Sequence, residues 1–418
     1  MDIKAKLALL KKTAENVDKK HQKKKKPVEK PALVLPDFIE EETPEGTVYY
    51  RETSFPLRHR HGSLFLYEIF DSPPEILAFL ATDENYGEMD LKKTLFVDTE
   101  TTGLAGGSGT CAFLTGAGFL RDGNFVVRQY FMPDYMYENA MLAHFLNLVK
   151  EHTGFVSFNG KSYDLPLIKT RMAMNRLRCD FDDYFHLDLL HSGRRFWKKT
   201  LDSCSLTSLE TSVLDFKRED DVPGYLIPDL FFQYIRNKDF QPLDIVFQHN
   251  LFDIVSMAVL IARMWSHLEL AECGNLCGTE YFSLGRIYEI RGDEEKALSF
   301  YQKARNSQLP RHTKAKITEN IASILKKRKD HSQAVQMWEE MAGESELDIT
   351  PFVELAKYYE HTAKDIQKAI EYTDKAWEIT SRKRNAGFMS SYYAESEALK
   401  KRKERLRKKL EKKSKQPS

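Results

Sequence analysis

The sequence has little of what defines disulfide-rich, zinc-binding or membrane-spanning proteins. Its 418 residues include an odd number of cysteines with no paired Cys-x-x-Cys module: Cys111, Cys179, Cys204, Cys273 and Cys277. This pattern indicates neither a disulfide framework nor a zinc site, and it fits a reducing cytosol. There is no uninterrupted run of about 18 apolar residues, and the amino terminus is too rich in lysine for a cleaved signal peptide. We therefore expect a cytoplasmic protein that does not contact a membrane.

What the chain does have is apolar material for more than one core. Hydrophobic residues make up 42% of the sequence and charged residues 30%, which excludes disorder of the whole chain. Compact domains usually hold about 100–200 residues, so a chain of this length predicts two or three units.

Charge is distributed unevenly along the chain. Residues 1–30 carry a net charge of +7 and residues 381–418 a net charge of +10, which leaves −16 on residues 31–380 although the whole sequence is only +1. An acidic body is not a preformed groove for nucleic acid, so any such grip is expected from the basic ends and from bound metal. Solvated tails that only keep the protein soluble are an equal alternative for each end.

The first 36 residues are interpreted as a flexible basic segment, because a lysine run at 19–26 precedes Pro27, Pro31 and Pro36. Residues 47–50 and 63–67 then alternate like half-buried strands and predict an extra strand pair, followed by a helix near 74–82. We assign residues 45–270 to one domain with its core at 90–265.

The order of elements in that core indicates its fold. Apolar runs starting at Thr94, Thr110 and Asn124 are joined by tight turns and predict three antiparallel strands. A helix at 138–150 leads to a strand at 154–158, which should lie parallel to the first. Helical patterns dominate from Asp164 to an apolar-faced helix at 243–268. This order predicts a ribonuclease H-like α/β domain, in which flanking helices cover a mixed sheet of three antiparallel and then parallel strands.

The sequence after residue 275 is helical and repetitive. Small residues recur at Gly285, Ala322 and Ala356, 37 and then 34 positions apart, near the period of about 34 of a tetratricopeptide (TPR) helix hairpin. We expect residues 276–380 to form an all-α TPR-like solenoid whose concave surface suits a protein partner. An ordinary helical bundle is the alternative. Residues 381–418 are interpreted as a basic C-terminal helix or tail.

Four acidic residues are the candidate chemical centre. Asp98 and Glu100 end the first core strand two residues apart, so both side chains point to one face. Asp164 follows the parallel strand, whose carboxyl end should reach the same edge of the sheet. Asp253 lies in the long apolar helix four residues after His249, which places both on one helix face. Taken singly, each has a structural explanation, such as a helix-start acid for Asp164 or a buried pair for His249 and Asp253.

Together these acids predict a metal site. Four carboxylates within a few ångströms would repel one another unless cations were present, and two divalent ions about 4 Å apart neutralise such a cluster. Oxygen ligands favour Mg²⁺ or Mn²⁺ over zinc, and such ions support phosphodiester hydrolysis. His249 is suited to take the proton from the attacking water, because histidine is the commonest general base in enzymes.

Three motifs carry a resemblance. The segments Phe96-Val-Asp98-Thr-Glu100-Thr-Thr-Gly-Leu104, Asn159-x-x-x-x-Asp164 and His249-Asn-x-x-Asp253 resemble the motifs of DEDD (DnaQ-like) 3′→5′ exonucleases. With Leu187-Asp188-Leu-Leu and Asp221-Val-Pro-Gly-Tyr, the combination is most similar to the bacterial YprB-like branch of ribonuclease H-like proteins.

The resemblance implies roles for single residues. Asp98, Glu100, Asp164 and Asp253 would ligate two Mg²⁺ or Mn²⁺ ions, and His249 would position or deprotonate the nucleophilic water. In the family a histidine usually lies five residues before the last aspartate, whereas His249 lies four before it, the spacing normally taken by tyrosine.

The residues around these motifs are candidates for substrate binding. Asn159 and Lys161 could contact a phosphate or the terminal nucleotide, and Thr101 and Leu104 could abut the terminal base. Ordinary turn or surface roles are an equal alternative for all four. Asp188 is interpreted either as a supporting acid or as a helix start, and the basic cluster at 194–199 as a nucleic-acid contact or a solvated helix face.

The function predicted from the sequence is a metal-dependent nuclease, a 3′→5′ exonuclease on single-stranded or terminal DNA or RNA. The alternative is a catalytically weak or inactive nucleic-acid-binding scaffold whose TPR-like repeats recruit a protein partner. Retention of all four acids favours the enzyme, since a pure scaffold does not need them.

Overall fold

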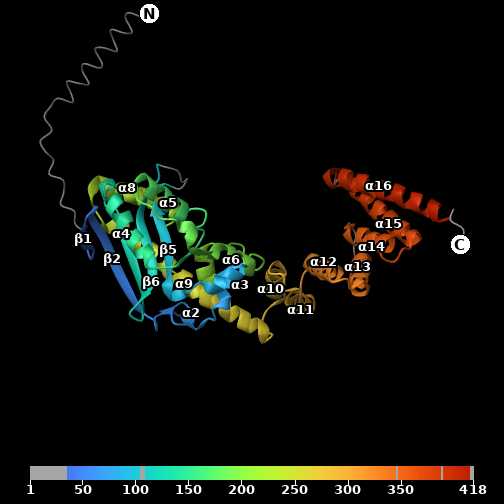
Figure 1. The fold of residues 1–418 in the computed structure, drawn as a ribbon, viewed down its shortest axis with the longest axis horizontal. Helices are drawn as coiled ribbons and strands as arrows, with labels where there is room; N and C mark the ends of the chain where they lie inside the picture. The colour runs from blue at the N-terminus through green and yellow to red at the C-terminus, as the bar shows by residue number, and fades with distance from the viewer. Residues whose placement is uncertain (1–34, 104–108, 345–346, 387–388, 415–418) are drawn as a thin grey trace, which may run out of the picture.

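The computed structural model describes residues 35–103, 109–344, 347–386 and 389–414. An α/β body lies at one end of an elongated molecule and a succession of helices extends away from it (Figure 1). This arrangement confirms the predicted fold class, a mixed sheet with flanking helices followed by an all-helical region.

The body is built on a seven-stranded sheet of order β1-β2-β7-β6-β5-β8-β9. In chain order the strands are β1 (Ile39–Thr43), β2 (Gly46–Pro56), β5 (Thr94–Thr101), β6 (Ala112–Arg121), β7 (Asn124–Phe131), β8 (Gly154–Ser157) and β9 (Phe185–Asp188). The strands β5, β6 and β7 form the predicted antiparallel meander, and β8 pairs parallel to β5. Asp122 and Gly123, both at positive φ, close the β6–β7 hairpin with the conformation that a two-residue turn requires.

The predicted strand pair at 47–50 and 63–67 was wrong. The segment at 47–50 does not pair with 63–67; it belongs to β2, which pairs with β1 and β7. Residues 63–67 contribute only β4 (Leu64–Phe65), which pairs with β3 (Arg60–His61). The strand β9 was also missed, because four residues are too few to show a period of two against the helical sequence on either side.

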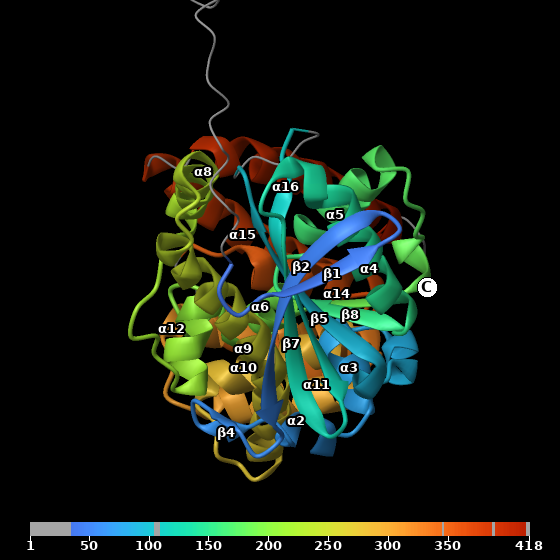
Figure 2. The same cartoon turned by 90° about the vertical axis from the view of Figure 1, so that its left-hand side faces the viewer.

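Helices cover both faces of the sheet. The helices of the body are α2 (Glu68–Asp71), α3 (Glu75–Ala81), α4 (Glu138–Lys150), α5 (Asp164–Met174), α6 (Leu189–Trp197), α7 (Leu206–Leu209), α8 (Ile227–Asn237) and α9 (Asp244–Glu272). Figure 2 shows the twisted strands with α4 and α5 on one side and α6 and α9 on the other. Leu95 and Val97 of β5 pack in the core on the α4 side, whereas Phe96 between them packs with α9. This alternation assigns the residues of β5 to one face or the other.

The long helix α9 is a core helix. By length and composition alone, Gln241–Glu272 could cross a membrane, but 67% of its most apolar window is buried inside the protein. Its apolar residues are explained by the sheet and helices that they contact.

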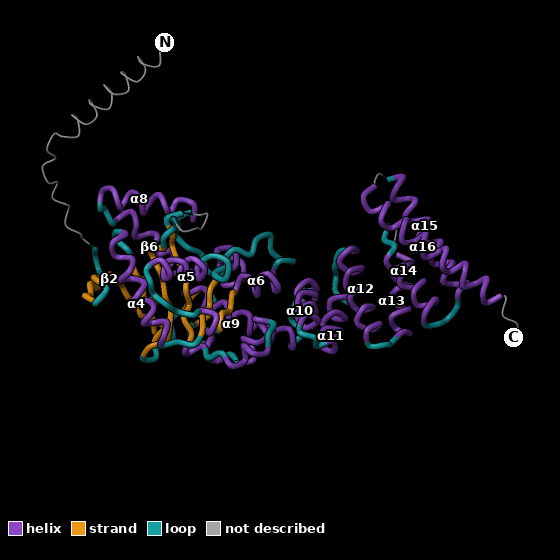
Figure 3. Tube along the Cα trace, turned by 45° about the horizontal axis from the view of Figure 1, so that its top comes forward, coloured by secondary structure: helices purple, strands orange, loops and turns teal. Residues whose placement is uncertain are grey.

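The helical region consists of successive antiparallel pairs (Figure 3). Its helices are α10 (Gly278–Ile290), α11 (Glu294–Arg305), α12 (Arg311–Lys327), α13 (His331–Glu344), α14 (Thr350–His361), α15 (Ile366–Asn385) and α16 (Met389–Ser414). Gly285 explains one close approach, since a Cβ atom there would lie 2.5 Å from Cδ1 of Tyr301. The predicted pairing of helices through small residues agrees with this contact.

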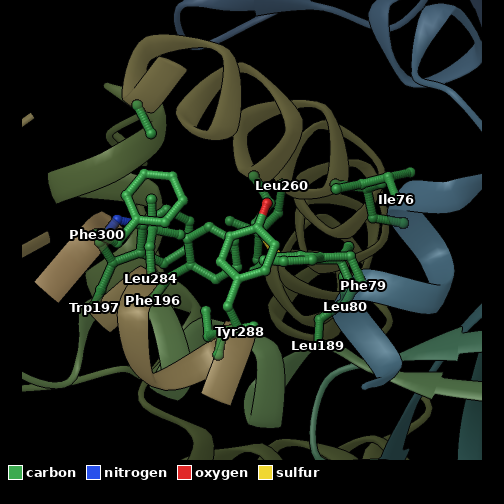
Figure 4. Packing of buried hydrophobic residues seen from close by; sticks show 14 of the residues in the cluster. Ile76, Phe79, Leu80, Leu189, Phe196, Trp197, Leu260, Leu284, Tyr288 and Phe300 are labelled. Carbon is green, nitrogen blue, oxygen red and sulfur yellow. The ribbon is translucent and has the colours of Figure 1, made fainter. Parts of the chain in front are cut away.

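The body and the first helical pair share one apolar core (Figure 4). Phe79 of α3 packs on Tyr288 of α10 with ring centroids 5.1 Å apart, and Arg291 donates a hydrogen bond to the Ala78 carbonyl at 2.6 Å. Trp197 of α6 and Phe300 of α11 belong to the same cluster.

The helix α16 is fixed to α14 by charge as well as by apolar contacts. Leu399 and Leu406 are buried, and the buried carboxylate of Glu360 accepts hydrogen bonds from Arg402, Arg405 and Lys409. One face of α16 is therefore committed to docking.

Candidate active site

The first two acids lie at the carboxyl end of β5. Asp98 and Glu100 continue the alternation from Phe96, so they belong to the face of the sheet that packs on α9. Burial raises the pKa of each well above its usual value, and the neighbouring charges of Asp253 and Asp164 raise both further. Carboxylates that affect one another in this way lie close enough for their charges to repel.

Asp164 begins α5 and contacts β5 directly. Its Oδ1 atom accepts hydrogen bonds from the Thr99 amide at 3.1 Å and from the Thr99 hydroxyl. Burial raises its pKa to about 6, although these hydrogen bonds oppose the rise. Asp164 therefore does more than complement a helix terminus, because it joins α5 to the strand that carries Asp98 and Glu100.

His249 and Asp253 lie on one face of α9, as their spacing predicts. The His249 Nε2 atom is 3.9 Å from Oε1 of Glu100 and 3.6 Å from Oδ2 of Asp253. The other ring nitrogen, Nδ1, is 2.6 Å from Oδ1 of Asp221. The structure thus brings β5, α5 and α9 together so that four acids and one histidine converge.

Sequence reasoning missed the arginine at this site. Arg218, whose side chain is 4% exposed, donates hydrogen bonds to both Glu210 oxygens, at 2.9 and 2.6 Å, and to Asp253. Its Nη1 atom lies 3.1 Å from Nδ1 of His249 and 3.5 Å from Oδ1 of Asp221. Asp221 belongs to a motif of the resemblance, but no periodicity or spacing in the sequence marks Arg218 or Glu210.

Glu210 holds the arginine in place from an unusual backbone segment. It is the first residue of η5 (Glu210–Leu214), a single turn of π-helix, and its carboxylate also accepts a hydrogen bond from Ser256 of α9. Turns of π-helix are rare in proteins, and those that occur are often found at functional sites.

Asn250 was missed as well, although it directly follows His249. This buried side chain donates a hydrogen bond to Asp98 and accepts one from Gln129 of β7. It therefore connects the first acid to the middle of the sheet.

A cavity of about 450 Å³ opens beside the acids. Asp98 and Asp164 line it, together with the predicted substrate residues Thr101 and Asn159 and the exposed ring of Tyr163. A larger cavity, of about 1000 Å³, lies among α11, α12 and α13 and includes none of the acids.

The other substrate predictions fared differently. Lys161 does not line the cavity; its Nζ atom is 3.4 Å from the Tyr86 hydroxyl. Leu104 lies outside the described residues. Asp188, at the end of β9, accepts backbone hydrogen bonds from Asn159 and Lys161 and from Leu190 at the start of α6, so it holds the loop before Asp164.

Two members of the basic cluster at 194–199 have packing partners. Arg195 donates a hydrogen bond to the Leu80 carbonyl, and the Lys199 ammonium lies 4.8 Å from the centre of the Phe282 ring. Arg195 thus joins α6 to α3 within the body, and Lys199 contributes to the junction between the body and α10.

The chemistry of the acids suits a metal ion, but the arrangement of their side chains does not form a metal-holding group among the described residues. An all-carboxylate set of oxygen ligands suits Mg²⁺ or Mn²⁺. Yet within residues 35–103, 109–344, 347–386 and 389–414 no group of three or more His, Cys, Asp or Glu side chains is arranged to hold a metal ion. Arg218 contacts Oδ1 of Asp253, an oxygen that could otherwise bind a metal ion.

Comparison with known proteins agrees with the fold. Residues 95–265 match the family described as RNase_H superfamily, a range that contains Asp98, Glu100, Asp164, His249 and Asp253. This part of the chain is therefore a ribonuclease H superfamily domain, which suggests a role in nucleic-acid processing.

The similarity to one relative extends further. The chain is 30% identical over 336 residues to "Uncharacterized protein YprB" of Bacillus subtilis (strain 168), which covers 78% of this chain and 79% of that protein. An alignment of this length cannot fit before residue 276, so it continues into the helical region. The predicted resemblance to the YprB-like branch is confirmed at this level.

Proposed function

We propose that this protein is a metal-dependent nuclease of the DEDD type, a 3′→5′ exonuclease acting on single-stranded or terminal DNA or RNA. One observation carries the proposal: Asp98, Glu100, Asp164 and Asp253 converge, with His249 beside them, at the carboxyl end of β5. Buried acids that raise one another's pKa are costly to the fold, and such clusters gather at functional sites.

The four acids would hold two Mg²⁺ or Mn²⁺ ions. When bound, these ions stabilise the charge that develops on the phosphate and on the leaving oxygen. His249 receives the proton of the attacking water at Nε2, while Asp221 fixes the ring through Nδ1. Attack forms a new phosphorus–oxygen bond and breaks the bond to the 3′-oxygen of the preceding nucleotide, which releases a nucleoside 5′-monophosphate.

The substrate end would enter the cavity beside Asp98 and Asp164. Its volume of about 450 Å³ suits one nucleotide. The exposed ring of Tyr163 offers a stacking surface for a base, and Thr101 and Asn159 offer polar contacts to the sugar or phosphate. An unpaired terminus is required, because a paired base could not leave the duplex to reach these walls.

The remaining parts have supporting roles in the proposal. Residues 45–270 form the nuclease domain, residues 276–380 a TPR-like array for a protein partner, and residues 1–36 and 381–418 basic ends that grip nucleic acid. The place of action is the cytoplasm.

The test is an assay of the full chain on 5′-end-labelled single-stranded DNA and RNA, with Mn²⁺ or with EDTA. We expect a ladder of shortened products with Mn²⁺ only, and none from Asp98→Asn. A control is Asp244→Asn, because Asp244 begins α9 outside the acidic cluster and pairs with Arg51. Activity in Asp98→Asn equal to that of the unaltered chain would refute the proposed centre.

The second candidate is a nucleic-acid-binding scaffold with little or no catalysis. The ion pair between Arg218 and Asp253 favours it, because a carboxylate held by arginine is less available for a metal. Binding of labelled single strands without any cleavage in Mn²⁺ or Mg²⁺ would select this function.

A further inference from the structure

The carboxylate site contains a cation that the chain itself supplies. Arg218 contributes one positive charge between Glu210, Asp253 and Asp221, deep enough that only 4% of its side chain is exposed. Its charge also acts on Asp98 and Glu100, where it opposes the rise of both pKa values. Arg218 is thus part of the electrostatics of the whole acidic cluster.

The contacts of Arg218 are unequal. Two hydrogen bonds join it to Glu210, whose side chain is 1% exposed and is fixed in turn by Ser256. Asp253 accepts a hydrogen bond only from Nη2, the nitrogen that also donates to Glu210. Oδ1 of Asp221 lies 3.5 Å from Nη1. Withdrawal of the guanidinium from Asp253 would thus break one hydrogen bond and leave two to Glu210, with Asp221 near enough to pair with Nη1.

We propose that Arg218 is a built-in competitor of divalent cations: it neutralises Asp253 while the site holds no metal, and it must withdraw from Asp253 for the site to load fully. This inference rests on the proposed function in taking the acids as ligands of a divalent ion. It explains why suitable donors do not form a metal-holding group among the described residues. It also gives the enzyme a threshold, since Arg218 lowers metal affinity and loading depends on the free concentration of the ion.

Removal of the competing charge should tighten metal binding. A positive charge a few ångströms from a divalent cation repels it strongly at the effective dielectric constant of a protein interior. We expect Arg218→Gln to bind Mn²⁺ at least about tenfold more tightly than the unaltered chain, with Arg218→Lys in between. The lysine variant keeps the charge but has no planar fork to join Glu210 and Asp253 at once.

A change on the other side of the arginine should have the opposite sign. In Glu210→Gln the anchor loses its charge, so Arg218 pairs more firmly with Asp253 and Mn²⁺ binding weakens. Generic damage to the site would weaken binding in both variants. Opposite shifts therefore separate competition from misfolding.

The experiment is a calorimetric titration of Mn²⁺ into the full-length variants, with Arg128→Gln as the control. Arg128 forms a similar part-buried pair with Glu52 on the far part of the sheet, and its loss should leave Mn²⁺ affinity unchanged. Near-ultraviolet circular dichroism checks folding, and if Arg218→Gln fails to fold, Arg218→Lys and Glu210→Gln still give opposite shifts.

Two results would overturn the inference: Mn²⁺ affinity that is equal or weaker in both Arg218 variants, or no uptake in any variant. The nuclease assay is read separately. A chain that cleaves nothing but shows the opposite shifts would retain the competition and lose the proposed activity.

Discussion

Asn250 Nδ2 lies 2.8 Å from Oδ2 of Asp98, and this hydrogen bond connects the first acid of the site to the helix that carries His249 and Asp253. The amide oxygen of Asn250 accepts a hydrogen bond from Gln129 at 2.9 Å, which fixes its orientation. The space for it exists because residue 116 of β6, opposite Asp98, is glycine. A Cβ atom there would lie 2.3 Å from the Asn250 oxygen.

Gly116→Ala should therefore damage both stability and activity. The added methyl group also meets Ile254 Cδ1 at 2.4 Å, so we expect a loss of about 1–3 kcal/mol in the free energy of unfolding by urea. Displacement of Asn250 should further lower nuclease activity at temperatures where the variant is folded.

The control is Gly118→Ala on the same strand. Its added methyl group would meet Ile254 Cγ2 at 2.5 Å and Phe125 Cζ at 2.7 Å but not Asn250. A similar loss of stability with near-normal activity is expected there. Equal losses of activity in the two variants would exclude a special role for Asn250.

His249→Ala should reduce the rate and spare the fold. Loss of a positioned general base costs about 10²–10⁴-fold in kcat, with a smaller change in KM. Asp221→Asn, which removes the negative charge beside Nδ1 of His249 and Nη1 of Arg218, should have a weaker effect in the same direction. Steady-state kinetics on a labelled oligonucleotide checks this, and an unchanged kcat in His249→Ala would assign the base elsewhere.

Stability without divalent ions should depend on pH through Asp164. Its pKa is raised from the usual 3.8 to about 6, chiefly by burial, so the folded chain keeps a proton that the unfolded chain releases. The free energy of unfolding should therefore fall by about 2–3 kcal/mol as pH rises from 4 to 7. Urea unfolding in EDTA measures it, and Asp164→Asn should lack this part of the slope. Identical pH profiles for the two chains would contradict the assignment.

The docking of α16 should depend on Glu360. Burial alone would raise its pKa, but hydrogen bonds from Arg405 and Lys409 and the charges of Arg405 and His361 lower it to about 2. The stabilisation is present above the usual value of 4.5 and is lost as pH falls toward 2. Since Arg405 and Lys409 are half-exposed, we expect these contacts to stabilise the docked position of α16 by about 1–2 kcal/mol. Hydrogen exchange of α16 amides should accelerate in Glu360→Gln and stay unchanged in Glu397→Gln, where the carboxylate pairs only locally with Lys401.

The opposite face of α16 should bind the nucleic-acid backbone. Its exposed cations include Lys400, Arg407, Lys408 and Lys412. Replacement of all four by glutamine should reduce the slope of log affinity against log salt for single strands by about 2–3. Filter binding at several salt concentrations measures the slope, with the exposed pair Lys92 and Lys93 changed to glutamine as a control. An unaltered slope would mean that this face is only solvated.

Regular patterns in the sequence predicted the large elements. The apolar runs of β5, β6 and β7 and the period of α4 and α9 are long enough to be read without tertiary information. The short strand β9 and the partners of β2 were beyond reach, since they are decided by which surfaces the sheet leaves uncovered.

The site was predictable only where function fixes the spacing. Asp98 and Glu100 lie two apart on a strand, and His249 and Asp253 four apart on a helix, so local geometry places each pair. Arg218 reaches the acids from a loop, and its partner Glu210 sits in a π-turn that no propensity predicts. Contacts of this kind depend on the completed fold.

The shared core between α3, α6, α9, α10 and α11 has a practical consequence for anyone dissecting the chain. A truncation after residue 275 would expose the rings of Phe79 and Trp197 to water, so we expect the fragment to aggregate unless detergent is present. The helices that follow therefore cover an apolar surface that the α/β body would otherwise expose.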